Sequence, residues 1–214
     1  MNGSVLDIIA RIETPFAEKF GVPRQSGIAD SPGRIVFEKP FRDADAVRGL
    51  EGFSHIWLIW QFDRAQRQSW SPTVRPPRLG GNERVGVFAT RSPFRPNGLG
   101  LSAVELDVRG ADMVSGTPIV DIKPYLAYAD SYPDAAGGFT GGDAGAVLTV
   151  DFPPELLAQF DSGQRHGLLS ALAADPRPRY QDDPDRVYGM AYAGKNVRFT
   201  VQDGTVRVVG VECR

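Results

Sequence analysis

The sequence predicts a mainly β protein in two parts, a larger N-terminal domain and a smaller α+β domain after it. Short apolar runs bounded by glycine and proline recur through the first 125 residues. Two short helical patterns and a two-stranded hairpin follow closer to the C-terminus. A stretch rich in glycine, alanine and aspartate precedes them, so we expect domains at residues 1–145 and 146–214.

Six segments of the larger domain are expected to be strands: residues 4–13, 34–37, 54–62, 86–90, 99–106 and 119–125. The segment 54–62 is apolar on both faces, which predicts a central strand. Residues 18–28 have neither helical nor strand periodicity, and their interleaved apolar side chains favour an ordered loop. Residues 43–50 have helix-forming character, with Asp43 as the N-cap.

The smaller domain is expected to begin with two short helices, at residues 154–160 and 164–174. A proline-stiffened connector covers residues 175–180. The pair Asp203-Gly204 separates two alternating segments, 196–202 and 205–212, and predicts the clearest hairpin in the chain.

The stretch 86–101 reads Gly-Val-Phe-Ala-Thr-Arg-Ser-Pro-Phe-Arg-Pro-Asn-Gly-Leu-Gly-Leu. Its two prolines fix φ and its Asn-Gly pair favours positive φ, so an irregular, rigid loop is expected between two strands. That loop would present four polar side chains at a strand end: Arg91, Ser92, Arg95 and Asn97. A long connection with solvated arginines fits the composition equally well.

The charge distribution points to a specific anionic partner rather than a general polyanion. The net charge is −2, yet residues 64–95 hold seven arginines and one acid, while residues 130–161 hold six acids and no lysine or arginine. Most of the basic residues are arginine, which suits bidentate phosphate contact and base stacking. A GC-rich genome would also produce an arginine excess.

Several classes of chemistry are poor fits. The two histidines are far apart in sequence and Cys213 is the single cysteine, so we expect no metal site and no internal disulfide. We find no phosphate-binding glycine loop, no dinucleotide fingerprint and no nucleophile elbow. With neither a membrane-length apolar stretch nor a signal peptide, the expected location is the cytoplasm. The residues alone therefore indicate a barrel-like or sandwich-like β domain with an arginine-bearing ligand loop.

The stretch 86–101 resembles the signature of the TrmO (TsaA-like, YaeB) family. Further segments agree with it in order: residues 19–25 (KFGVPRQ), 74–82 (VRPPRLGGN), 116–125 (GTPIVDIKPY), 175–180 (DPRPRY) and 196–199 (NVRF). The resemblance implies an S-adenosyl-L-methionine-dependent methyltransferase that modifies N6 of threonylcarbamoyl-adenosine beside the anticodon of tRNA. It also implies a small β-barrel instead of a Rossmann sheet, and a homodimer.

The resemblance further implies which residues bind the cofactor: Ser26, Gly27, Ile28, Asp63, Arg64, Arg91, Leu101, Ala111, Asp112, Met113 and Val114. We expect Arg75, Arg78 and Arg95 to engage the anticodon stem-loop. Asp121 and Tyr125 are candidates for accepting the N6 proton, although a buried structural role fits both equally, and His55 is a weaker candidate. Between Glu105 and Gly116 the chain is shorter than the family pattern, and Ser115 replaces the usual acid.

Two other functions remain open at this point. The same loop could bind RNA or a nucleotide on a non-catalytic β-barrel. Alternatively, a methyltransferase could keep the barrel and the cofactor site and act on a protein or a small molecule. The arginine pattern favours RNA.

Overall fold

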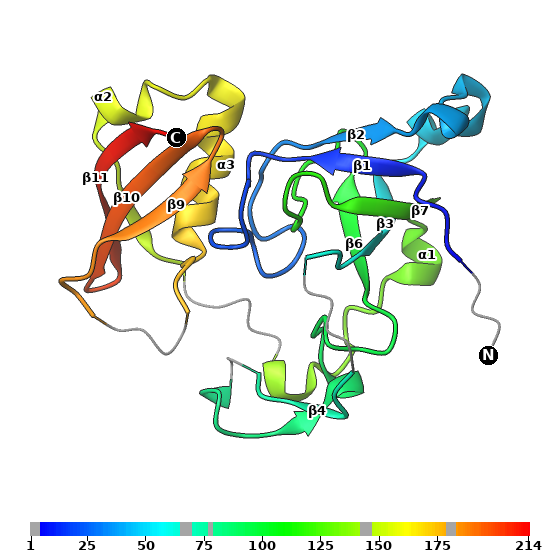
Figure 1. Cartoon of the computed structure of the whole chain (residues 1–214), viewed down its shortest axis with the longest axis horizontal. Helices are drawn as coiled ribbons and strands as arrows, with labels where there is room; N and C mark the ends of the chain where they lie inside the picture. Colours follow the sequence, from blue (N-terminus) through cyan, green and yellow to red (C-terminus); the bar gives the residue numbers. More distant parts are fainter. Residues whose placement is uncertain (1–4, 65–69, 77–78, 142–146, 179–182) are drawn as a thin grey trace.

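The computed structural model describes residues 5–64, 70–76, 79–141, 147–178 and 183–214. It is sheet-rich and contains few helices, so the expected mainly β fold is confirmed (Figure 1). One sheet has five strands in the order β2-β1-β7-β3-β6, a second has four in the order β8-β11-β10-β9, and β4 and β5 form a ribbon. Figure 1 shows β4 apart from both larger sheets.

The five-stranded sheet consists of β1 (Ala10–Glu13), β2 (Arg34–Phe37), β3 (His55–Gln61), β6 (Leu99–Glu105) and β7 (Pro118–Pro124). Burial alternates along β3, with Ile56, Leu58 and Trp60 in the core. β3 lies between β7 and β6, so the prediction of a central strand is confirmed. On its other face, the indole N–H of Trp57 donates to Asp130 of the short helix α1 (Ala127–Asp130) at 2.8 Å.

The five-stranded sheet curls until its two ends approach each other. A single antiparallel bridge joins Pro32, before β2, to Arg109, after β6, and the amide of Gly110 donates to the carbonyl of Ser31 at 3.0 Å. Among the described residues, this single bridge is the β-pairing between the two ends of the sheet. A closed barrel would need a continuous ladder of hydrogen bonds there, so the sheet is curled and incompletely closed. Residues 106–116 contain turns and no named strand, as the shortened segment suggested.

Three of the sequence-based predictions for this part of the chain are wrong in detail, the third being the start of the first strand. The expected strand at 86–90 ends at Gly86, because β4 (Thr73–Val74) pairs with β5 (Val85–Gly86) and the 3-10 turn η5 (Val87–Ala89) follows. The Thr90 hydroxyl closes that turn on the carbonyl of Val87 at 2.8 Å. The expected helix at 43–50 is replaced by the 3-10 turns η2 (Ala44–Val47) and η3 (Leu50–Gly52), separated by Gly49 at φ +86°.

The remaining elements of this part lie as follows: the first strand starts at Ala10 rather than residue 4, η1 spans Lys39–Phe41, and η6 spans Gly138–Thr140.

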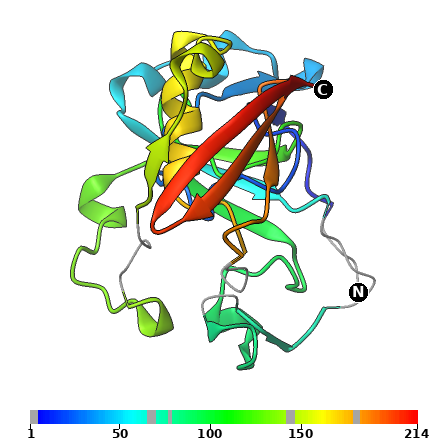
Figure 2. The same cartoon turned by 90° about the vertical axis from the view of Figure 1, so that its left-hand side faces the viewer.

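The four-stranded sheet consists of β8 (Thr149–Asp151), β9 (Tyr188–Tyr192), β10 (Lys195–Gln202) and β11 (Thr205–Cys213). The predicted hairpin is confirmed, and both turn residues, Asp203 and Gly204, have positive φ as a tight hairpin of this kind requires. The helices α2 (Pro154–Leu157) and α3 (Ser162–Ala173) accompany the sheet. Figure 2 shows α3 behind the long β10–β11 hairpin.

Helix α3 starts at a complete capping box. The Asp161 carboxylate accepts from the Gln164 amide at 2.8 Å, and the Gln164 side chain accepts from the Asp161 amide at 3.3 Å. Further along the helix, Leu168 and Leu172 are fully buried against the sheet. The capped start and the apolar face explain why this pattern forms a stable helix.

The segment 14–31 leaves the five-stranded sheet and packs into the core of the four-stranded one. Phe16 and Ala29 are buried there, and the amide of Ala193 donates to the carbonyl of Pro15 at 2.8 Å. The Phe20 ring packs against both Tyr188 and Phe199, at centroid distances of 6.4 and 6.5 Å. The expected ordered loop is therefore confirmed, and its order comes from the second core.

Among the described residues, no helix has both the length and the apolar content that crossing a membrane would require.

Candidate functional site

The loop Ser26–Ile28 lies directly against the chain before Asp112. The amide of Gly27 donates to the carbonyl of Gly110 at 2.9 Å. Gly110 has φ +81°, and a Cβ atom there would stand 3.3 Å from the Gly27 backbone. Both the positive φ and the close approach favour glycine at this position. The structure thus brings together two of the segments that the resemblance assigned to the cofactor.

Arg91 joins the same region from the 87–98 loop. The Nη1 atom of Arg91 donates to Oε1 of Gln25. The Nε2 atom of Gln25 in turn donates to the carbonyl of Arg24 at 2.5 Å. Arg91 is exposed. The side chain with the strongest anion-binding chemistry is therefore held over the loop that precedes Ser26.

Asp112 provides a partly buried carboxyl at the same place. Ser102 donates its hydroxyl to Oδ1 at 2.5 Å, and the indole N–H of Trp60 donates to that hydroxyl oxygen at 2.9 Å. Burial raises the pKa of Asp112 above its ordinary value. Hydrogen bonds from Ser102 and the backbone, and then the charge of Arg91, act in the opposite direction.

The loop around Arg91 is braced from within. The Thr90 hydroxyl accepts from the Ser92 amide at 3.2 Å, and the Ser92 hydroxyl accepts from the Phe94 amide at 3.3 Å. Arg95 then reaches back, and its Nη1 donates to the carbonyl of Thr90 at 2.6 Å. The rigidity that the prolines predicted is thus reinforced by side-chain bonds within the loop.

The other residues predicted around Asp112 contribute mainly packing and backbone contacts. Ala111 and Met113 are buried. The carbonyl of Met113 accepts from the Thr14 hydroxyl at 2.9 Å, and that of Val114 accepts from the Thr117 hydroxyl at 2.7 Å. The first bond ties Met113 to the start of the segment 14–31, and the second closes the turn at 114–117.

Arg64 connects two loops through their backbones. Its Nη1 donates to the carbonyl of Ala17 at 3.1 Å and its Nη2 to that of Ser115 at 2.8 Å, while the neighbouring Asp63 is exposed. Leu101 lies elsewhere, opposite Ile59 in the β3–β6 register and 54% exposed. Because side chains alternate along β6, Leu101 points away from the face that carries Ser102 and Asp112.

The candidates for accepting a proton lie on that outer face as well. Asp121 is opposite Ile59 in the β3–β7 register, and its Oδ2 forms an ion pair with Lys123 at 2.8 Å. The Tyr125 ring packs on Trp57 and His55, at centroid distances of 5.4 and 6.1 Å. Within one chain, the sheet therefore separates these three candidates from Asp112.

The arginines predicted to bind RNA lie around the β4–β5 ribbon. Arg75 follows β4 and is exposed. The Cζ atom of Arg95 lies 5.7 Å from the ring centroid of Phe88. Arg78 lies outside the described residues.

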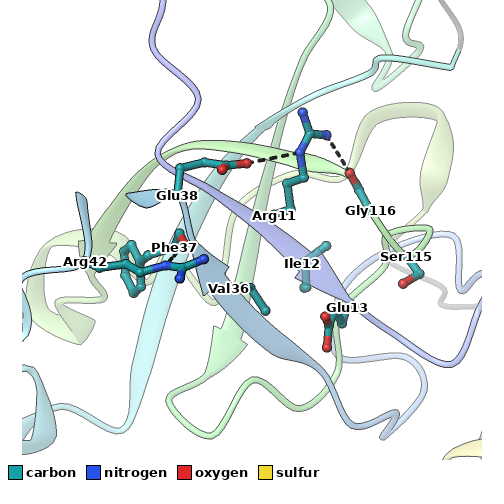
Figure 3. Close-up of a pocket in the computed structure, with 9 residues that line it drawn as sticks. All are labelled: Arg11, Ile12, Glu13, Val36, Phe37, Glu38, Arg42, Ser115 and Gly116. Atoms are coloured by element: carbon teal, nitrogen blue, oxygen red, sulfur yellow. Dashed lines mark hydrogen bonds and ion pairs between the residues drawn. The ribbon is translucent and has the colours of Figure 1, made fainter. Parts of the chain in front are cut away.

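A groove of about 360 Å³ opens on the outer surface of β1 and β2 (Figure 3). Arg11 forms an ion pair there with Glu38 at 3.3 Å and donates to the carbonyl of Gly116 at 3.1 Å, while Arg42 donates to the carbonyl of Phe37 at 2.6 Å. The guanidinium groups in the groove thus contact other groups of the protein. None of the residues expected to bind the cofactor lines it.

The sequence did not indicate three residues at this place. Gln25 accepts a hydrogen bond from Arg91. Ser102 donates to Asp112 and is itself held by the indole N–H of Trp60. One signal was available for Ser102, a polar residue within the apolar run 99–106. No group of three metal-ligating side chains is found in the described part of the chain.

Comparison with known proteins gives a consistent result over the whole chain. The family model described as "tRNA-methyltransferase O N-terminal domain" matches residues 11–131, and the one described as "TrmO C-terminal domain" matches residues 145–214. A curated "tRNA (adenine(37)-N6)-methyltransferase" of Escherichia coli is 40% identical, and the alignment covers all of both chains. One of the same name from Eikenella corrodens is 45% identical over 74% of this chain and 97% of its own.

Two further comparisons agree. A Pseudomonas aeruginosa protein named "Putative S-adenosylmethionine-dependent methyltransferase RcsF" is 40% identical over 85% of this chain and 86% of its own. Among solved structures, "Crystal structure of TrmO from P. areuginosa" superimposes with a TM-score of 0.79 at 32% identity, covering 100% of this chain and 99% of that one.

Proposed function

The chain belongs to the tRNA-methyltransferase O family, and we propose that it transfers a methyl group from S-adenosylmethionine to adenine 37 of tRNA. It is a tRNA (adenine-N6)-methyltransferase by this family membership and by full-length likeness to curated enzymes of that name. We propose further that the acceptor is N6 of the threonylcarbamoyl-adenosine beside the anticodon. The observation that carries the site is the meeting of Ser26–Ile28, Arg91 and Asp112.

The residues present at this meeting point fit S-adenosylmethionine. The cofactor carries a carboxylate, for which the exposed Arg91 guanidinium is suited, and amino and hydroxyl groups that a carboxyl such as Asp112 and nearby backbone can bind. When bound, it supplies a methyl group on a positively charged sulfur, and the neutral thioether that remains after transfer is a good leaving group. The protein then has to hold the acceptor nitrogen in line with that methyl carbon and to exclude water.

Asp63, Arg64 and Leu101 remain predictions as cofactor residues. The guanidinium of Arg64 donates to the carbonyls of Ala17 and Ser115, so we propose that it acts by holding these two loops together. Asp121 and Tyr125 remain candidates for accepting the N6 proton, and tRNA would reach them only from the outer face of the sheet.

Three further proposals concern the whole chain rather than single residues of the site. We propose a division of the chain near residue 145, a homodimer as the working form, and the cytoplasm as the place of reaction. The anticodon stem-loop is the proposed RNA contact, with Arg75, Arg78 and Arg95 as the residues that bind it.

Methyl transfer from labelled S-adenosylmethionine to tRNA from cells lacking this enzyme tests the proposed function. We expect one methyl group on threonylcarbamoyl-adenosine by nucleoside mass analysis, and its loss in Arg91→Ala. Arg198→Ala is the matched control, because Arg198 is a half-exposed arginine paired with Glu212 on the second sheet. Methylation at another nucleoside would move the acceptor, and no transfer with intact cofactor binding would reject tRNA as the substrate.

A further inference from the structure

Two large aromatic side chains are exposed together at the loop 87–98, which carries Arg91. Trp70 is 49% and Phe88 is 68% exposed, and their rings stack at a centroid distance of 6.2 Å and an interplanar angle of 24°. The other two tryptophans form hydrogen bonds within the chain: the indole N–H of Trp57 donates to Asp130, and that of Trp60 donates to Ser102. An exposed aromatic pair adds little to the core and is typical of a binding surface.

The pair is held in place by the backbone on both sides. Val87 is buried beside Phe88 and its amide donates to the carbonyl of Pro72 at 3.0 Å. The amide of Ser71, next to Trp70, donates to the carbonyl of Phe94 at 3.4 Å. The turn η5 therefore directs Val87 inward and Phe88 outward, and the same scaffold that fixes Arg91 fixes the aromatic pair.

The surroundings of the pair are cationic. The Arg95 guanidinium lies over the Phe88 ring at 5.7 Å, and Arg84 donates to the Thr73 hydroxyl at 2.8 Å on the same ribbon. Arg75 is exposed nearby, and Glu83 is the single acid between residues 70 and 95. Flat aromatic faces among arginines suit a nucleotide, because its base can stack while its phosphate meets a cation. A protein-binding patch would be expected to have fewer charges at its centre.

We propose that Trp70 and Phe88 form a stacking platform for an unpaired base of the tRNA anticodon loop, a nucleotide next to the one that is methylated. Phe88 precedes Arg91 by three residues in the same braced loop, so a base on this platform would lie beside the cofactor site. Sequence-tolerant stacking of single-stranded bases needs only such a platform and nearby cations. The proposal rests on the proposed function, because it takes tRNA as the substrate.

Affinity for an anticodon stem-loop RNA tests the platform, measured with the full chain by fluorescence anisotropy. We expect Trp70→Ala and Phe88→Ala each to raise the dissociation constant about tenfold. Trp70→Phe should keep most of the affinity, while Phe88→Leu should lose it, because leucine keeps the apolar volume without an aromatic face. The salt dependence should keep its slope in these variants, since stacking releases no counterions, whereas Arg75→Ala should flatten it.

A second readout follows Trp70 itself. The Trp70 ring is exposed while that of Trp60 is buried, so bound RNA should quench the emission of Trp70. The Trp70→Phe variant lacks this emission, so adding RNA should quench its remaining tryptophan fluorescence much less. Because Phe88 is exposed, thermal unfolding of Phe88→Ala should match the wild type, which separates loss of the platform from loss of the fold.

The possible outcomes separate this proposal from the function on which it rests. Unchanged RNA affinity in Trp70→Ala and Phe88→Ala, with wild-type methyl transfer to tRNA intact, would overturn the platform alone. Weaker binding of S-adenosylmethionine with unchanged RNA affinity would assign the pair to the cofactor instead. A change in oligomeric state in these variants would assign it to a contact between copies of the chain. Absence of tRNA binding by the wild type would overturn both proposals.

Discussion

The two loops that meet at the site are held in different ways. The segment 14–31 is anchored by residues far away in sequence, with Phe16 and Phe20 in the core of the four-stranded sheet. The loop 87–98 is braced by its own hydroxyls and by Arg95, and it carries Phe88 outward. They join where Arg91 donates to Gln25.

This difference teaches that the two halves of the site depend on different parts of the fold. The geometry of Ser26–Ile28 should follow the stability of the second core, because its segment enters that core on both sides, at Phe16 and Ala29. The geometry around Arg91 should survive changes in that core. The four-stranded sheet therefore supports the loop that we propose to bind the cofactor.

The largest expected effect comes from removing the anchor of the first loop. Phe16 is fully buried and meets the Tyr192 ring edge-on at a centroid distance of 5.3 Å. Phe16→Ala should lower the free energy of unfolding by about 3–5 kcal/mol, measured by chemical denaturation. Phe88→Ala, in the other loop, should change it by less than about 0.5 kcal/mol. Similar losses in both variants would remove the contrast between the loops.

A smaller effect is expected where α3 touches the first loop. A Cβ at Gly167 would stand 2.7 Å from the Tyr192 hydroxyl oxygen, 2.9 Å from Cα of Ser31 and 3.0 Å from the carbonyl oxygen of Asp30. Gly167→Ala must therefore displace the segment together with Tyr192, whose ring packs on Phe16 of that segment. We expect a loss of about 1–3 kcal/mol in the free energy of unfolding, together with weaker binding of S-adenosylmethionine.

Gly163 in the same helix provides a matched control. A Cβ there would meet only the Asp161 carboxylate, at an ordinary 3.5 Å, so Gly163→Ala should leave both quantities unchanged or raise stability slightly. Equal losses in the two variants would show that the helix, and not its contact with the loop, is responsible.

Two carboxyls should give pH effects of opposite sign. Burial raises the pKa of Asp112, so the folded chain keeps a proton that the unfolded chain has lost, and stability falls as pH rises through that range. Asp112→Asn should therefore reduce this fall, as measured by thermal unfolding between pH 4 and 7.

Asp30 is the converse case. Its hydrogen bonds with Arg109 lower its pKa, so its contribution to stability is present at neutral pH and is lost as pH falls below the ordinary value of 3.8. Asp30→Asn should destabilise the protein at neutral pH and lose this effect in acid. The same sign of change in both variants would contradict the assigned causes.

Local patterns predicted the parts of the fold that local forces determine. The Asp203-Gly204 hairpin and the strand 34–37 were predicted because turn chemistry and alternation specify them. The prediction of a strand at 86–90 was wrong because its apolar composition does not distinguish a strand from a 3-10 turn. The turn is specified by the Thr90 hydroxyl and by a carbonyl at Pro72.

The site was predictable in part for a similar reason. Motif resemblance indicated Ser26–Ile28, Arg91 and Asp112, and the structure brings them together. It could not show that Phe16 enters a core built by residues after 145, or that Ser102 orients Asp112, because these contacts join residues that no local pattern relates.

Binding of S-adenosylmethionine to arginine variants, by isothermal titration, tests most directly where the site lies. Arg91→Ala should weaken binding about tenfold to a hundredfold, as expected when a charged hydrogen bond to the ligand is lost. Arg11→Ala, in the groove on β1 and β2, should bind as the wild type does. The reverse result, with Arg11→Ala impaired and Arg91→Ala unaffected, would contradict the proposed site and place the cofactor in the groove.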